Sequence, residues 1–107
     1  MLKDYGRVVG PLKVFIEKAA NIPNDNTFKL LGAKVDPFCV VFLSMDDTKQ
    51  IIKTDVKKND LQPVWNYKGN LLINTRMRQA KELKLVVQIQ HAGSVTNDIL
   101  GQCEIPL

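Results

Sequence analysis

Residues 83–90, LKLVVQIQ, decide the fold class because they carry the most regular alternation in the chain. Successive side chains of a β-strand point to opposite faces, so residues two apart share a face. One set of alternate positions is entirely apolar: Leu83, Leu85, Val87 and Ile89. The other set is half polar. The stretch is therefore predicted to be a strand with one face in the core and the other partly exposed.

Further short strands are predicted around this one, at residues 12–20, 38–43, 49–56, 71–73 and 100–105. The FCVVFL run at 38–43 is apolar on both faces, which is typical of a central strand. Asp46 and Asp47 are expected to form the turn of a hairpin between this strand and 49–56. Trp65, the only tryptophan, is expected to be buried from within a turn at residues 61–66 that leads into the strand at 71–73. Short strands without a long helix predict an all-β antiparallel sandwich.

Composition bounds the class of protein. With 107 residues, the chain is predicted to be one domain, residues 1–107, with a core that needs no metal or disulfide. The longest apolar run has six residues, against about 20 for a membrane-spanning helix. Cys39 and Cys103 have no paired spacing and are expected to be buried and reduced. These features predict a cytoplasmic protein. The net charge of +4 mildly favours anionic partners, and no nucleic-acid partner is expected.

Segments along nearly the whole chain resemble a known family when taken in order. They are LKVFIEKAANIP, VDPFCVVFL, IIKTDVKKNDLQPVWN, LKLVVQIQ and NDILGQCEIPL. Together they resemble the C2 domain, a Greek-key β-sandwich of eight strands. The resemblance implies that function lies in three loops at one end of the sandwich, here residues 22–36, 58–66 and 90–98.

The strand count falls short of the eight that this resemblance implies. Besides the six predicted strands, only residues 5–9 suggest a seventh. The last strand is therefore expected to be missing or supplied from outside the chain, and the domain is expected to be a piece of a larger protein. An open sheet edge invites pairing with a strand of another chain, or with a second copy in a homodimer.

Calcium-dependent C2 domains bind the ion with aspartates of the first and third loops. Matching those positions gives a degenerate set: Asp25, Asp36, Gln88, Gln90 and Asp98. Calcium takes six to eight oxygen ligands and binds more tightly when more of them are charged. Two glutamines in place of aspartates remove two negative charges, so neither calcium nor another cofactor is expected. Asp36 and Asp98 are instead expected to stabilise turns through nearby backbone amides.

The sequence gives no reason to propose an enzyme. It contains no glycine-framed serine, no phosphate loop and no metal motif. His91 is the only histidine and has no cysteine or histidine cluster beside it, so it is expected to be a solvent-facing loop residue. The chain is predicted to be a non-catalytic module.

Two functions of different class remain open. In the first, the module docks on anionic phospholipid through a basic face comprising Lys49, Lys53, Lys57, Lys58 and Lys84, the first three spaced to share one face of a strand. Lysines near anionic lipid contribute about 1 kcal/mol each. The membrane would also receive apolar loop tips, namely Phe28, Leu30, Leu31 and Val95. The protein would then be cytoplasmic and peripheral at a membrane.

In the second function, the module is a scaffold part that binds protein. C2 domains with a strong lipid-headgroup patch carry a lysine in the central strand, where this chain has Val40. Neighbouring positions such as Cys39, Val41 and Gln88 also predict a less charged surface. Charge alone does not decide between the two functions.

Overall fold

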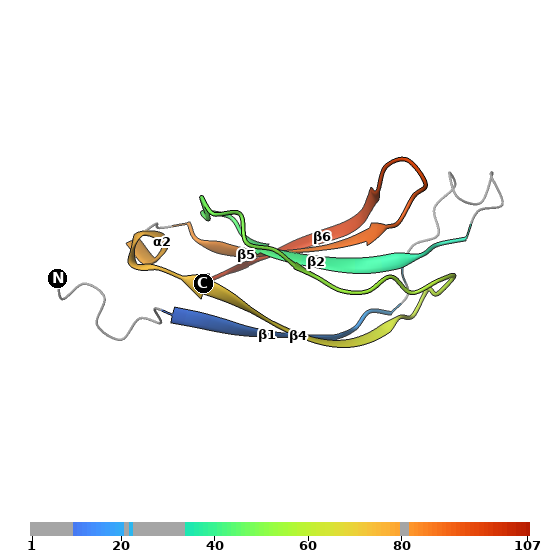
Figure 1. Ribbon diagram of the computed structural model, residues 1–107, viewed down its shortest axis with the longest axis horizontal. Coiled ribbons are helices and arrows are strands. Elements are labelled where there is room, and N and C mark those ends of the chain that lie inside the picture. Colours follow the sequence, from blue (N-terminus) through green and yellow to red (C-terminus); the bar gives the residue numbers. More distant parts are fainter. Residues whose placement is uncertain (1–9, 21, 23–33, 80–81) are drawn as a thin grey trace.

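The computed structural model describes residues 10–20, 22, 34–79 and 82–107, which form two antiparallel β-sheets packed face to face (Figure 1). In the smaller sheet, β1 (Gly10–Lys18) pairs with β4 (Val64–Ile73). The larger sheet has the order β3 (Ile52–Lys53), β2 (Pro37–Leu43), β5 (Lys84–His91) and β6 (Asp98–Pro106). The predicted antiparallel sandwich is confirmed. Among the described residues, no helix is long and apolar enough to cross a membrane.

The core lies between β2 and the small sheet. Cys39, Val41 and Leu43 of β2 are at most 3% exposed, and Leu71 of β4 is completely buried. The alternation along β1 and β4 directs one face of each strand into this core, as a period of two requires. The close approach of β4 to β3 requires Gly69, because a Cβ atom there would lie 2.9 Å from the Ile52 side chain.

Trp65 is buried as predicted, but it lies within β4 rather than in a turn before it, since β4 begins at Val64. Its exposed fraction is 7%, and its Nε1 donates a hydrogen bond of 2.9 Å to the carbonyl of Asp55. The indole therefore links the first residues of β4 to the segment after β3. This satisfies the polar atom of a buried aromatic residue.

The predicted strand at 49–56 was too long, because only Ile52–Lys53 form β3. Before β3, the Asp46 carboxylate accepts hydrogen bonds from the amides of Thr48 and Gln50 and holds a turn. After β3, the hydroxyl oxygen of Thr54 accepts a hydrogen bond of 2.8 Å from the Cys39 amide. This oxygen takes the place of a backbone carbonyl as the acceptor. Side-chain acceptors of this kind compete with the strand ladder.

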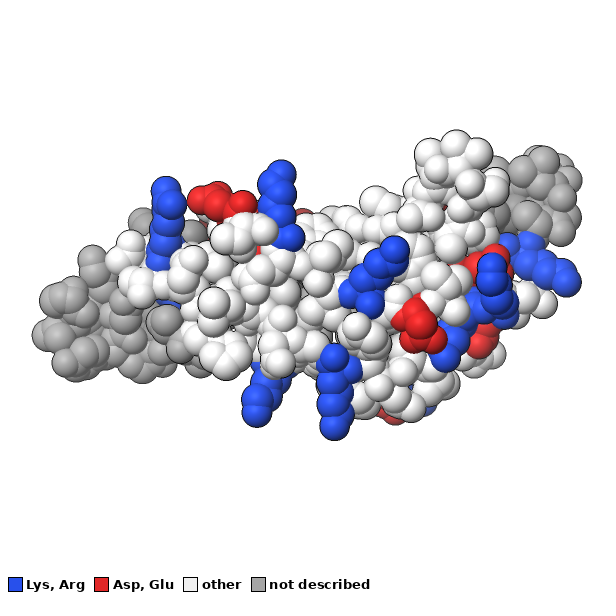
Figure 2. All heavy atoms as spheres, in the orientation of Figure 1, with Lys and Arg blue, Asp and Glu red and all other residues white. Residues whose placement is uncertain are grey.

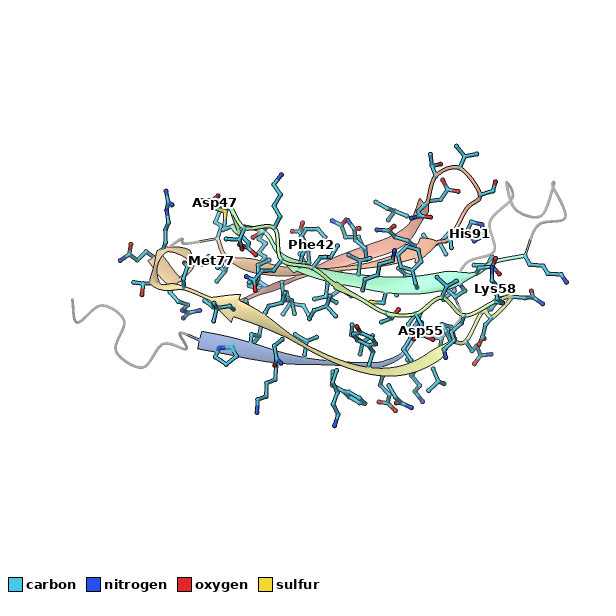
Figure 3. The ribbon with its side chains drawn as sticks, in the orientation of Figure 1. Phe42, Asp47, Asp55, Lys58, Met77 and His91 are labelled. Atoms are coloured by element: carbon cyan, nitrogen blue, oxygen red, sulfur yellow. The ribbon has the colours of Figure 1, made fainter. Side chains whose placement is uncertain are left out.

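The described chain also contains a short helix, α2 (Thr75–Gln79). Asn74 precedes it, and its side-chain oxygen accepts the Met77 amide at 2.9 Å, which is an N-cap. Met77 is 4% exposed and packs on the core. The helix therefore closes the end of the sandwich opposite His91 (Figure 3).

The two sheets are unequal in width, and the core-facing side chains of the larger sheet become more exposed from β2 towards β6. Within the described chain, β1 pairs only with β4 and β6 only with β5. Leu85, Val87 and Ile89 of β5 are half-buried, whereas Ile105 of β6 is 45% exposed. The described residues thus provide no strand opposite β6, which agrees with the predicted shortage of strands.

This difference in width corrects the prediction that both cysteines are buried. Cys39 is 1% exposed, and burial, followed by the neighbouring Cys103, raises its pKa to about 11. Cys103 is exposed because it lies on uncovered β6. Both thiols are free, as predicted.

Candidate functional site

The loops at one end of the sandwich are joined through Asp36, immediately before β2. Its Oδ1 accepts the Asn59 amide at 2.7 Å, and its carbonyl accepts the Ala92 amide at 3.0 Å. Its own amide donates to Nδ1 of His91 at 3.0 Å. One residue therefore links the segment after β3 to the loop after β5. Asp36 bonds a backbone amide, as expected, but that amide belongs to a distant segment and not to a local turn.

His91 is not the solvent-facing loop residue that was predicted. It is the last residue of β5, it is 9% exposed, and it lies in register with Pro37 of β2 and Asp98 of β6. The signal was present in the sequence, because His91 continues the phase of Val87 and Ile89. Extending the core-facing alternation by one more step would have found it.

Gln88 and Gln90 lie on the opposite face of β5 from His91 and are not beside Asp36 and Asp98. Gln90 donates to the side chain of Gln88 at 2.9 Å, and Gln88 donates to that of Gln102 at 2.8 Å. The three amides therefore form a chain on the outer face of the large sheet. The structure brings His91, rather than the two glutamines, beside Asp36 and Asp98.

Asp36, the described first-loop residue that matches a calcium ligand, already has other bonding partners. Calcium requires six to eight oxygen ligands. One Asp36 oxygen is already bonded to an amide, the other lies 3.9 Å from Nζ of Lys58, and the neighbouring side chain is an imidazole. In the part of the chain that the structure describes, no three His, Cys, Asp or Glu side chains could together hold a metal. Asp25 lies outside the described residues.

The predicted basic face is divided among several parts of the molecule. Lys49 lies in the turn before β3 with a φ of 56°, and only Lys53 belongs to that strand. Lys57 and Lys58 follow β3 at the loop end, and Lys84 begins β5. The even spacing of 49, 53 and 57 therefore does not put these lysines on one strand face, because turns flank the two-residue strand. Figure 2 shows basic and acidic side chains interspersed.

Carboxylates accompany three of the five lysines. Nζ of Lys57 lies 2.9 Å from Asp55, and this hydrogen bond holds the pKa of the Asp55 carboxyl below its usual value. Lys84 lies 3.3 Å from Glu104, and Lys58 faces the Asp36 carboxylate at the longer distance given above. Lys53 is different, since its ammonium lies 5.0 Å from the centre of the Phe38 ring, within cation–π range.

Of the residues predicted to insert into a membrane, the described part of the chain includes Val95. Val95 is 92% exposed at the tip of the loop between β5 and β6, which rises on the side away from β1 and β4 (Figure 1). Phe28, Leu30 and Leu31 lie outside the described residues. Figure 3 shows Lys58 and His91 at this same end of the molecule.

Family comparison decides what this sandwich is. A model of the C2 domain matches residues 10–107. The chain belongs to the C2 domain family. Sequence comparison with curated proteins gives no match.

Solved structures share the C2 fold. A C2 domain of plant extended synaptotagmin 1 has a TM-score of 0.73 and 24% identity, covering 94% of this chain and 70% of that one. A C2 domain of RIM from Drosophila has a TM-score of 0.73 and 21% identity, covering 92% and 75%. Human GIVD cytosolic phospholipase A2 has a TM-score of 0.72 and 25% identity over 90% of this C2 domain. The chain spans 13% of that phospholipase and 20% of an extended synaptotagmin 2 structure.

Proposed function

We propose that this C2 domain is a non-catalytic targeting module that docks a larger cytoplasmic protein on anionic phospholipid membranes without calcium. The observation that carries the proposal is the composition of the loop end. Val95 is 92% exposed at a loop tip, and the side chain of Lys58 at the same end is 82% exposed. An apolar tip accompanied by cations suits a bilayer, which presents phosphates above an apolar interior.

Independence from calcium is supported by how the loop end is already bonded. In calcium-dependent docking, the ion supplies positive charge between acidic loops and acidic lipid. Here Lys58 lies beside the Asp36 carboxylate, and the amide of Asn59 occupies one of its oxygens. Attraction to the bilayer is therefore assigned to lysines. Such attraction weakens as salt shortens the Debye length.

Binding to a protein is the alternative function, and the outer face of the large sheet favours it. The amide chain of Gln88, Gln90 and Gln102 forms this surface, and Val40 is buried beside it, at 4% exposure. Glu104 neutralises Lys84 on the same face. A polar, weakly charged surface of this kind resembles a protein interface more than a phosphate-binding patch.

A second route to a protein partner is strand pairing at β1 or β6, each of which has one neighbouring strand among the described residues. The exposed backbone of an edge strand can add a strand from another chain or from a second copy. Sedimentation tests this route, since pairing between copies would make the apparent mass rise with concentration. A monomer at all concentrations would contradict self-pairing.

Flotation with phosphatidylserine vesicles in a calcium chelator tests the main proposal. The protein is expected to float at low salt, to float less at raised salt, and not to float with neutral vesicles. Val95→Glu should weaken flotation, because it introduces a charge at the tip. Ile51→Glu is the matched control, since Ile51 is 59% exposed and lies near Phe42, away from the loop end (Figure 3). Equal effects of the two substitutions, or no flotation by the unmodified protein, would overturn the proposal.

A further inference from the structure

The outer face of the small sheet carries an exposed aromatic side chain between two cations. Leu12, Val14 and Ile16 of β1 pack toward the core, so the alternate residues Lys13 and Phe15 point outward. Phe15 is 55% exposed and lies directly opposite Lys68 of β4. Lys13 is opposite Asn70, which makes Lys13 and Lys68 diagonal neighbours about 7–8 Å apart.

These cations differ from most of those in the predicted basic face. Neither Lys13 nor Lys68 makes an ion pair within the described part of the chain, whereas Lys57, Lys58 and Lys84 each face a carboxylate. Glu17 is the one acidic residue among the outward positions of β1 and β4. Lys13 and Lys68 outnumber Glu17, so this face retains a net positive charge.

The surface is also hollowed, with apolar and cationic side chains side by side. A shallow depression of about 450 Å³ is lined by Lys13, Val14, Phe15, Lys68, Gly69 and Asn70. Leu72, on the same face of β4, is 56% exposed. Cations beside an exposed aromatic ring match the headgroup region of an anionic bilayer, where phosphate lies above acyl chains. Two lysines are few for a nucleic acid, whose binding typically uses several phosphate contacts.

We propose that this outer face of β1 and β4, centred on Phe15, is a second contact surface for anionic phospholipid bilayers. The inference rests on the proposed function, because it assumes that Val95 and its loop form the first contact. The β5–β6 loop rises away from β1 and β4, so the two surfaces face different directions (Figure 1). Figure 2 shows basic side chains projecting below the body on the side of the small sheet. One flat bilayer cannot contact both surfaces, so the module joins two bilayers.

The test measures flotation and vesicle clustering on the same samples, using phosphatidylserine vesicles, a calcium chelator and low salt. Clustering is followed by dynamic light scattering. The unmodified protein should float and cluster the vesicles. Lys13→Gln/Lys68→Gln should float through the loop end but cluster poorly, because about 1 kcal/mol lost per lysine weakens this contact about 30-fold. Lys13→Arg/Lys68→Arg keeps both charges and should cluster normally.

The outcomes separate this inference from the proposed function. Flotation without clustering by the unmodified protein would overturn the inference and leave loop-end docking intact. Clustering that survives Lys13→Gln/Lys68→Gln would also overturn it, since a dimer would then be the bridge. If Val95→Glu changes neither signal while the lysine pair abolishes flotation, this face contacts lipid, but loop-end docking and the joining of two bilayers are both wrong. All substituted side chains are exposed, and thermal unfolding of each variant verifies that it folds.

Discussion

Replacing Thr54 by valine tests how β3 is attached to the core. Thr54 is 4% exposed, and its hydroxyl accepts the Cys39 amide at 2.8 Å. Valine has nearly the same shape but no acceptor, so the buried N–H loses its partner. The Asp55 carbonyl, which the hydroxyl also contacts, keeps its bond from Trp65. One unsatisfied buried donor costs about 1–3 kcal/mol.

Urea unfolding measures this cost. With a slope of about 1.5 kcal/mol/M, a loss of about 2 kcal/mol lowers the unfolding midpoint by roughly 1.3 M. Thr54→Ser keeps the acceptor and removes one methyl group, which costs about 0.8 kcal/mol. The reasoning is refuted if Thr54→Ser destabilises the domain as much as Thr54→Val, because the loss would then come from packing and not from the hydrogen bond.

Three other expectations concern single side chains. His91→Phe should lower the free energy of unfolding by about 1–3 kcal/mol, as measured in urea, because a backbone amide loses its acceptor. Lys57 lowers the pKa of Asp55, so its stabilisation is present above the unfolded pKa and disappears as pH falls through the folded one. The unfolding midpoints of Lys57→Gln and the parent should therefore differ at pH 7 and converge near pH 2. A difference in midpoint that is the same at both pH values would contradict this. A thiol reagent at pH 8 should modify exposed Cys103 rapidly and Cys39 only after denaturation, as counted by mass spectrometry.

Periodicity predicted the strands well where one face meets the core. Residues 83–90 fall within or beside β5, and 38–43 within β2, because burial on a pleated sheet imposes a period of two. The pattern failed at residues 49–56, where the side chains of Asp46 and Thr54 take over backbone hydrogen bonds. Whether a side chain replaces a backbone group in a hydrogen bond depends on distances in the folded chain, which a sequence does not contain.

The candidate site was harder to predict than the sheets. Phase alone would have placed His91 on the core-facing side of its strand, but the search for calcium aspartates directed attention to Gln88 and Gln90. Charge spacing suggested one basic face, yet carboxylates from other segments, such as Glu104, neutralise part of it. Long-range ion pairs follow from the folded arrangement of strands. The outward phase of β1 was visible in the sequence, whereas the cross-strand register that sets Lys68 opposite Phe15 was not.

The unequal width of the sheets sets how the domain opens in its native state. Amides of β2 and β5 lie between two neighbouring strands, but those of β6 have a neighbour on one side only within the described chain. Exposure of core-facing side chains rises from 1% at Cys39 to 45% at Ile105. Local opening costs least where few apolar contacts are lost. Hydrogen exchange should therefore be fastest along β6 and slowest along β2, so the strand nearest the open edge can detach transiently while the rest of the sandwich stays folded.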